Sequence, residues 1–170
     1  MQVEIQTEAA VAELHKLYVH QIYRYVYRRT LDQDLAKHIA NDAFRLAWQR
    51  TIPVNQDALP WLLVTARNLL RNEFRSQGRE HALTLKLAAE QRAQRPGQSS
   101  DTDAAVHGVL DALREKDREV LALAYWDGLE LTEIASFLGC SLEAAKSRLF
   151  RARKAFERKA PKELLKGGKN

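Results

Sequence analysis

Residues 131–153, LTEIASFLGCSLEAAKSRLFRAR, predict two short helices joined by a turn of three or four residues. Thr132 can cap the first helix, because threonine is a favoured N-cap residue. Gly139 ends that helix, since glycine reaches the left-handed conformation needed just past a helix C-terminus, and Ser141 caps the second helix. The segment therefore predicts a helix-turn-helix, in which two helices cross at a steep angle.

The two helices of this motif have distinct apolar and polar faces. The residues predicted to be buried are Ile134, Ala135 and Leu138 in the first helix and Leu142, Ala145, Leu149 and Ala152 in the second. The residues predicted to project from the other side of the second helix are Lys146, Ser147, Phe150, Arg151 and Lys154, with Arg148 and Arg153 on its flanks. Such a face can reach base edges and phosphates in a major groove; the alternative is a helical hairpin with an ordinary solvated face.

Positive charge is concentrated at the end of the chain. The formal charge is +5 over 170 residues, yet residues 141–170 alone carry ten Lys or Arg against three Glu, a net of +7. The first 140 residues therefore sum to −2. Basicity gathered around one helix is typical of a protein that binds a polyanion.

Several other classes of protein are disfavoured. No apolar run approaches the length of a membrane span, and the N-terminus lacks the pattern of a signal peptide, so we expect a cytoplasmic protein without membrane insertion. A single cysteine, Cys140, excludes an internal disulfide and makes a zinc site improbable; it is predicted to fill the turn. The histidines form no metal-binding motif and no phosphate loop is present, so we expect no metal, no cofactor and no catalytic site.

The chain divides into three parts. Residues 1–82 predict a helical domain with turns at 30–34 and 51–60, where Pro53 and Pro60 suit a loop and a helix start. Residues 83–107 shift to Gln, Ala, Ser and Asp around Pro96 and Gly97, which predicts a flexible linker that is helical at its start. Residues 108–170 form the second domain. We therefore expect an all-α protein of two small helical domains.

The first domain carries its own basic pattern. The predicted buried stripe contains Leu62, Leu63, Ala66, Leu69, Leu70 and Phe74. Arg67, Arg71, Arg75 and Arg79 recur every four residues beside it, with Asn68 and Asn72 adjacent. Like charges at this spacing repel by about 0.2–0.5 kcal/mol per pair, which favours a polyanion partner over a solvated face relieved by Glu73 and Glu80. Trp48 and Trp61 are interpreted as core anchors rather than stacking platforms.

Three segments together resemble a known family. They are DAFRLAW at residues 42–48, PWLLVTARNLLRNEFR at 60–75, and LREKDREVLALAYWDGLELTEIASFLGCSLEAAKSRLFRARKAF at 113–156. The chain is similar to bacterial RNA polymerase sigma factors of the extracytoplasmic-function (ECF) group of the sigma-70 family. The third segment is the most specific, and the resemblance covers most of the chain.

The resemblance implies a dissociable subunit of RNA polymerase that has no catalysis of its own. Residues 1–82 would be sigma domain 2, which clamps the β′ subunit and melts the minus-10 element. Residues 108–170 would be sigma domain 4, which binds the β flap and reads the minus-35 element, with a basic tail. The linker would keep the two DNA-binding domains apart.

The resemblance also implies residue roles. For the minus-35 element these fall on Lys146, Ser147, Phe150 and Arg151, with Thr132, Arg148 and Arg153 as phosphate contacts. For the minus-10 element they fall on Asn55, which would capture a flipped base, and on Trp61, Arg67, Asn68, Arg71 and Arg75. Extruding that base costs roughly a few kcal/mol.

The helix expected to bind core polymerase departs from the family pattern. The family reads A-E-D-L-x-Q-E-x-F, whereas this chain has AKHIANDAF at residues 36–44. Lys37 and His38 replace acidic residues, while Asn41 and Asp42 are conservative substitutes, so His38, Asn41 and Asp42 are the expected polymerase contacts. The change is either family drift or a rebalanced contact that leaves room for an anti-sigma partner.

Two rival functions are compatible with the same helix-turn-helix. An operator-binding regulator could end in the same helix-turn-helix, but it would need a dimerisation or sensing domain in front. A recombinase or nuclease would need clustered carboxylates, and Asp32, Asp34 and Asp42 are better interpreted as helix caps and a docking face. Partner dependence separates these functions, because a regulator binds duplex DNA alone.

Overall fold

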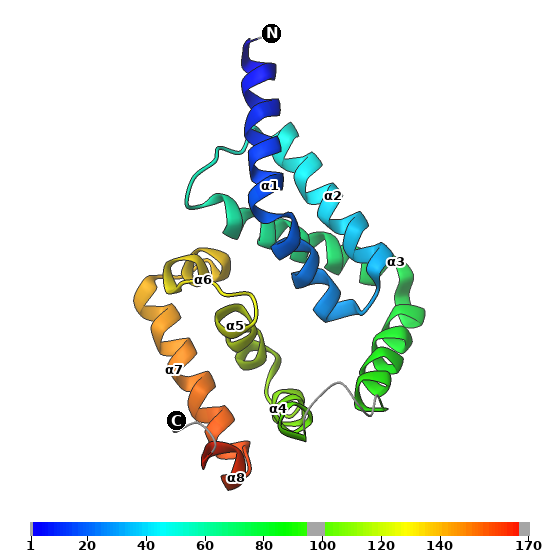
Figure 1. Ribbon diagram of the computed structural model, residues 1–170, viewed down its shortest axis with the longest axis vertical. Coiled ribbons are helices and arrows are strands. Elements are labelled where there is room, and N and C mark those ends of the chain that lie inside the picture. The colour runs from blue at the N-terminus through cyan, green and yellow to red at the C-terminus, as the bar shows by residue number, and fades with distance from the viewer. Residues whose placement is uncertain (1, 95–100, 167–170) are drawn as a thin grey trace. The chain divides into compact units, whose positions relative to one another are not determined.

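The computed structural model describes the backbone of residues 2–94 and 101–166, and the side chains within those ranges except at 2–6, 78–94 and 103. Every regular element in the described part of the chain is a helix, which confirms the all-α prediction (Figure 1). The chain divides into two compact units, residues 1–89 and 90–170. No helix within the described ranges is both long and apolar enough to cross a membrane.

Unit 1 begins with α1 (Gln2–Thr30) and α2 (Gln33–Gln49), which meet at the turn expected at 30–34. Thr30 is buried, and its hydroxyl donates to the Val26 carbonyl at 3.0 Å. Leu31 takes a φ of 53° at the bend. Asp32 then caps α2, because its Oδ1 accepts from the Leu35 N–H at 2.9 Å. The predicted closing and restarting of the helix is confirmed.

The core of unit 1 draws on α1, α2 and α3 (Ala58–Gln94). Its fully buried members include Leu14, Ile22 and Val26 of α1, Ala36, Ala43 and Ala47 of α2, and Leu62, Leu63 and Ala66 of α3. The predicted stripe on α3 is confirmed at Leu62, Leu63, Ala66 and Leu70, whereas Leu69 and Phe74 are only half-buried. Small alanines on α2 permit close approach of its neighbours.

The connection from α2 to α3 spans residues 50–57. The N–H groups of Arg50 and Ile52 donate to carbonyls in the last turn of α2, and Thr51 adopts a φ of 54°. Pro53 lies in this loop and Pro60 in the first turn of α3, as expected. Trp48 is 53% exposed, so its prediction as a core anchor is wrong; its position on α2 points away from the alanine face that packs.

Unit 2 contains α4 (Asp101–Asp111), α5 (Glu115–Tyr125), α6 (Leu131–Leu138), α7 (Leu142–Lys159) and α8 (Lys162–Lys166). The segment after Gly108 is divided by a turn at residues 112–114, where Leu113 is buried. Lys159 of α7 donates from Nζ to the carbonyl of Ala112 at 2.7 Å. This bond fastens the end of α7 to the end of α4.

The predicted linker at 83–107 contains helix on both sides of an undescribed stretch. The backbone is helical to Gln94, which agrees with the helix expected at its start, and helical again from Asp101. Pro96 and Gly97 lie outside the described residues.

Candidate nucleic-acid interface

The turn between α6 and α7 depends on Gly139. Its φ of 65° and ψ of 39° are left-handed, as predicted. The Gly139 N–H donates to the Ser136 carbonyl at 3.2 Å, and the Cys140 N–H donates to the Ala135 carbonyl at 3.0 Å. These two bonds are the Schellman pattern, which satisfies carbonyls at a helix end. Cys140 is half-buried in this turn with a free thiol.

The start of α6 differs from the prediction. Glu130, rather than Thr132, is the N-cap, and its N–H donates to Glu133 Oε2 at 2.8 Å. Thr132 is the second residue of the helix and is exposed, so it cannot cap from that position. The carboxylate of Glu133 in the first turn also interacts favourably with the positive end of the helix dipole, which stabilises α6. Thr132 remains placed where its hydroxyl is open to a ligand.

The start of α7 follows the prediction at Ser141. The Ala144 N–H donates to Ser141 Oγ at 3.1 Å, and Ser141 has extended dihedral angles. The buried residues of the motif are Ile134, Ala135 and Phe137 on α6 and Ala145, Leu149, Ala152 and Ala155 on α7. Leu142, the first residue of α7, is 38% exposed, so its predicted burial is wrong. Phe137 was missed, although its spacing from Ile134 is helical.

The exposed side of α7 brings the predicted reading residues together. Lys146, Ser147, Phe150 and Arg151 line one shallow, open hollow. Phe150 is 60% exposed, so its ring is open to a ligand. Lys146 Nζ lies 3.2 Å from Glu143 Oε1, and Arg151 Nε donates to the Ser147 carbonyl at 3.4 Å. The hollow thus combines two cations, a hydroxyl and an aromatic ring.

Arg148 and Arg153 flank this hollow, and both are exposed. Arg153 Nε donates to the hydroxyl of Tyr125, the last residue of α5, at 2.5 Å. Its guanidinium also lies over the Tyr125 ring, 5.5 Å from the centroid. Sequence reasoning missed Tyr125, because the two residues are 28 positions apart and no local pattern joins them.

The basic ridge of α3 is less uniform than its spacing implied. Arg71, Arg75 and Asn68 are exposed, whereas Arg67 and Trp61 are half-buried. A step of four residues turns the helix by about 40° beyond a full turn, so a row at that spacing winds around the axis. Arg67 consequently lies near the buried side and Arg75 well away from it. The side chains of Arg79 and Glu80 lie outside the described residues.

Asn55 lies in the exposed loop before α3. Its Oδ1 accepts from the Asp57 N–H at 3.0 Å, and its carbonyl accepts from the Ala58 N–H at 3.2 Å. This Asx turn orders the loop just ahead of the helix. A contact from Asn55 to a base therefore uses its amide N–H groups, or the second lone pair of Oδ1, unless the turn opens.

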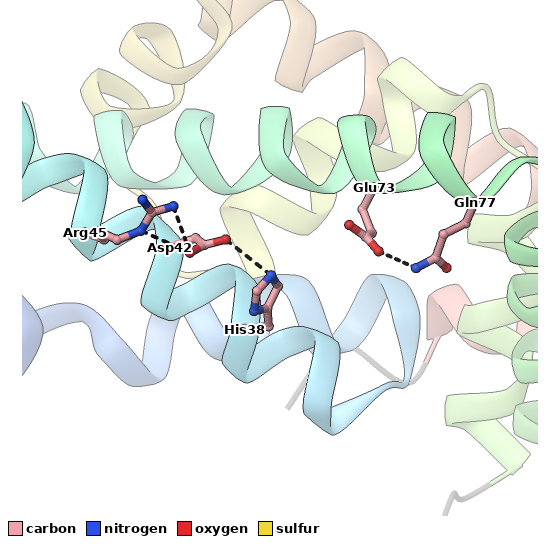
Figure 2. A network of polar contacts seen from close by, with 5 residues as sticks. All are labelled: His38, Asp42, Arg45, Glu73 and Gln77. Atoms are coloured by element: carbon pink, nitrogen blue, oxygen red, sulfur yellow. Dashed lines mark hydrogen bonds and ion pairs between the residues drawn. The ribbon is translucent and has the colours of Figure 1, made fainter.

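Helix α2, whose sequence departs from the family pattern, carries a cluster of charged and polar side chains (Figure 2). His38 Nε2 lies 3.3 Å from Asp42 Oδ2, and Arg45 Nη2 lies 3.2 Å from Asp42 Oδ1. Asp42 therefore sits between two potential cations, while Asn41 is exposed beside it. Figure 2 also shows Glu73 of α3 accepting from the Gln77 amide, so Glu73 has a partner on its own helix. The α2 cluster is a mixed-charge surface rather than an acidic one.

These features place the protein among helical proteins that carry a helix-turn-helix. The regular elements in the described ranges are all helices, the chain divides into two units, and the second unit carries a helix-turn-helix. The second helix of that motif is capped, packed by alanines and basic on its exposed side. Within the described residues, no group of three potential metal ligands occurs.

Comparison with known proteins names the family. Residues 103–156 match the family described as Sigma-70, region 4. The probable RNA polymerase sigma factor RfaY of Xanthomonas campestris is 36% identical over 135 residues, which are 73% of this chain and 34% of RfaY. The ECF RNA polymerase sigma factor SigM of Bacillus subtilis is 26% identical over 147 residues, covering 84% of this chain and 90% of SigM. Residues 103–156 therefore carry sigma-70 region 4, and the chain as a whole is similar to sigma factors of the ECF group.

A solved structure supports the fold. The sigma factor RpoE of Bartonella quintana, crystallised in complex with the anti-sigma factor NepR, aligns with a TM-score of 0.60 at 23% identity. The alignment covers 93% of this chain and 98% of that chain. By contrast, this chain spans only about a third of the length of RfaY.

Proposed function

We propose that this protein binds core RNA polymerase and directs it to specific promoters, without a catalytic step of its own. The observation that carries the proposal is the basic exposed side of α7, held by a capped helix-turn-helix within the segment that matches Sigma-70, region 4. A protein with this role acts where the polymerase is, in the cytoplasm.

The second unit reads the minus-35 element in this proposal. Lys146 and Arg151 donate to guanine acceptors in the major groove, and Ser147 and Phe150 contact neighbouring base edges. Thr132, Arg148 and Arg153 bind phosphates, which set the register of the helix on the duplex. The shallow hollow supports this assignment because its four lining residues are those that the family resemblance selects.

The first unit opens the minus-10 element. Asn55 captures an extruded base, and Trp61 supports the loop from the first turn of α3. The exposed Arg71, Arg75 and Asn68 hold strand backbone, while the half-buried Arg67 reaches it only from the edge of the packed face. Unstacking costs roughly a few kcal/mol per base, which these contacts must offset.

Helix α2 binds the polymerase clamp through His38, Asn41 and Asp42, and the second unit binds the β flap. Because Asp42 already contacts His38 and Arg45, the clamp contact replaces existing side-chain contacts instead of engaging an unpaired carboxylate. An anti-sigma factor is a further expected partner, since RpoE was crystallised with one.

Run-off transcription from a genomic fragment library tests the proposal. Purified core polymerase is used with and without this protein, and core binding is measured in parallel. Discrete start sites that need the protein support the proposal and deliver the promoter motif. Absence of core binding would overturn it. Core binding without transcription would show that the protein binds polymerase but does not direct it to promoters, which contradicts the proposed promoter recognition.

A further inference from the structure

Arg153, proposed above as a phosphate contact, is paired with Tyr125, a residue to which no role has been assigned. Tyr125 is 57% exposed although it ends a helix whose Val120, Leu121 and Leu123 are buried. Its hydroxyl accepts from Arg153 Nε at 2.5 Å, and its ring lies under the guanidinium. Tyr125 thus contacts the guanidinium group of Arg153 through both its hydroxyl and its ring.

The chemistry left on this pair is that of an anion site. Arginine has five N–H donors, and the Nε bond uses one, so the four on Nη1 and Nη2 remain outside that bond. A tyrosine hydroxyl that accepts a hydrogen bond still has its own hydrogen to donate. Two donor groups from different helices therefore converge on one place, where phosphate oxygens are the matching acceptor.

The position on α7 suits DNA backbone rather than bases. Arg153 follows Lys146 by seven residues, which is about two turns and ~10 Å along the same side of the helix. The major groove is about 12 Å wide, so an α7 that reaches bases with Lys146 brings Arg153 to the phosphates at the groove edge. Glu157, one turn beyond Arg153, pairs with Lys154 at 3.4 Å instead.

We propose that Tyr125 and Arg153 form a two-helix phosphate-binding site for promoter DNA, in which Tyr125 is a positioning residue for Arg153 and adds a donor of its own. This inference rests on the proposed function and deepens it. Orientation before binding reduces the side-chain entropy lost when the phosphate is engaged. The ring of Tyr125 stays in place in a phenylalanine variant, so the hydroxyl can be tested alone.

The test is a double-mutant cycle on the full chain bound to core polymerase, with Tyr125→Phe, Arg153→Ala and the double variant. Promoter affinity is measured over a range of salt concentrations. Arg153→Ala is expected to reduce the log-log salt slope by about 1, because one phosphate contact is lost. Tyr125→Phe is expected to weaken binding about threefold to tenfold, and less than about twofold when Arg153 is already alanine.

Lys116→Ala is the matched control, because it removes one exposed positive charge from the other end of α5. It should keep the parental salt slope. Independent, multiplying effects of the two substitutions, or parental affinity in Tyr125→Phe, would overturn the inference while leaving promoter binding intact. Loss of core binding in Arg153→Ala would place the pair against polymerase and overturn it as well. A parental protein that binds no promoter would refute the proposed function itself.

Discussion

Gly139 holds a backbone conformation that only a few residues tolerate. A Cβ added there meets nothing within 4 Å, so the cost of a substitution comes from the positive φ alone. We expect Gly139→Ala to destabilise unit 2 by about 1 kcal/mol, measured by urea denaturation. The control is Gly108→Ala in α4, which also has open space. It should stabilise the protein by roughly 0.5–1 kcal/mol, because alanine is the better helix former.

The test depends on the two substitutions changing the free energy of unfolding in opposite directions. Equal destabilisation by both would show that the left-handed turn does not determine the effect.

Arg151 faces the open hollow, away from the packed side of α7. We expect Arg151→Ala to lower promoter-specific transcription by about tenfold to a hundredfold, because a base-specific arginine contact contributes ~1–3 kcal/mol. Core binding should stay parental. The measurement is run-off transcription beside a pull-down on core polymerase, with Lys116→Ala as the charge-matched control. Equal loss of both activities would contradict the assignment of Arg151 to DNA.

Single residues show why local rules predicted some caps and missed others. Ser141 and Asp32 were predictable, because a short polar side chain directly precedes each helix. Thr132 was predicted because threonine is a favoured N-cap, whereas the observed cap, Glu130, belongs to a residue type that caps poorly in general. The readable signal was Glu133, three residues after Glu130, which completes a capping box. The Tyr125–Arg153 contact had no such signal, since it joins distant parts of the sequence.

Among the elements, α2 gives the sharpest test of polymerase binding. Its exposed Asn41 and paired Asp42 are the expected contacts. We expect Asp42→Ala to weaken core binding about tenfold, or ~1.4 kcal/mol, because the clamp would lose a carboxylate contact and Arg45 would lose its anionic partner at the interface. Fluorescence anisotropy with labelled protein measures this. Asp34→Ala, the same charge change in the first turn, is the control. A larger effect from Asp34→Ala would move the contact to the start of the helix.

At this scale the helices themselves were predictable, and their exposed faces only partly so. The turns at 30–34 and 51–60 were correct because a cap, a bend and prolines mark them. Arg67 is less exposed than the predicted basic ridge on α3 required. Residues spaced by four wind slowly around the helix axis, and the sequence alone does not show which of them end up beside the packed face. Trp48 was misplaced because period alone does not tell which side of an alanine-rich helix packs.

For the whole molecule, the uneven charge makes a prediction about the free protein. Residues 141–170 carry +7, so the chain without polymerase should bind duplex DNA weakly and equally for promoter and scrambled sequences. Affinity should fall steeply between low and moderate salt, and a preference for promoter should arise only with core polymerase. Titrations by anisotropy at two salt concentrations check both points. Promoter preference by the free chain would favour the operator-binding alternative.

The division into two helical units was predictable from composition, because a stretch rich in Gln, Ser and Asp separates two amphipathic regions. The helical extent of that stretch was not, since α3 continues to Gln94 and α4 begins at Asp101. Alanine, glutamine and glutamate are good helix formers, and a compositional shift alone does not stop a helix.

The hydrogen bond from Lys159 to the Ala112 carbonyl affects where the C-terminal boundary of an expressed fragment should lie. The family match ends at residue 156, three residues short of that lysine. A gene fragment designed on the match alone would therefore lose the cation that caps the end of α4, an interaction of roughly 0.3–1 kcal/mol. It would also lose α8. A stop codon placed after Lys166 keeps both.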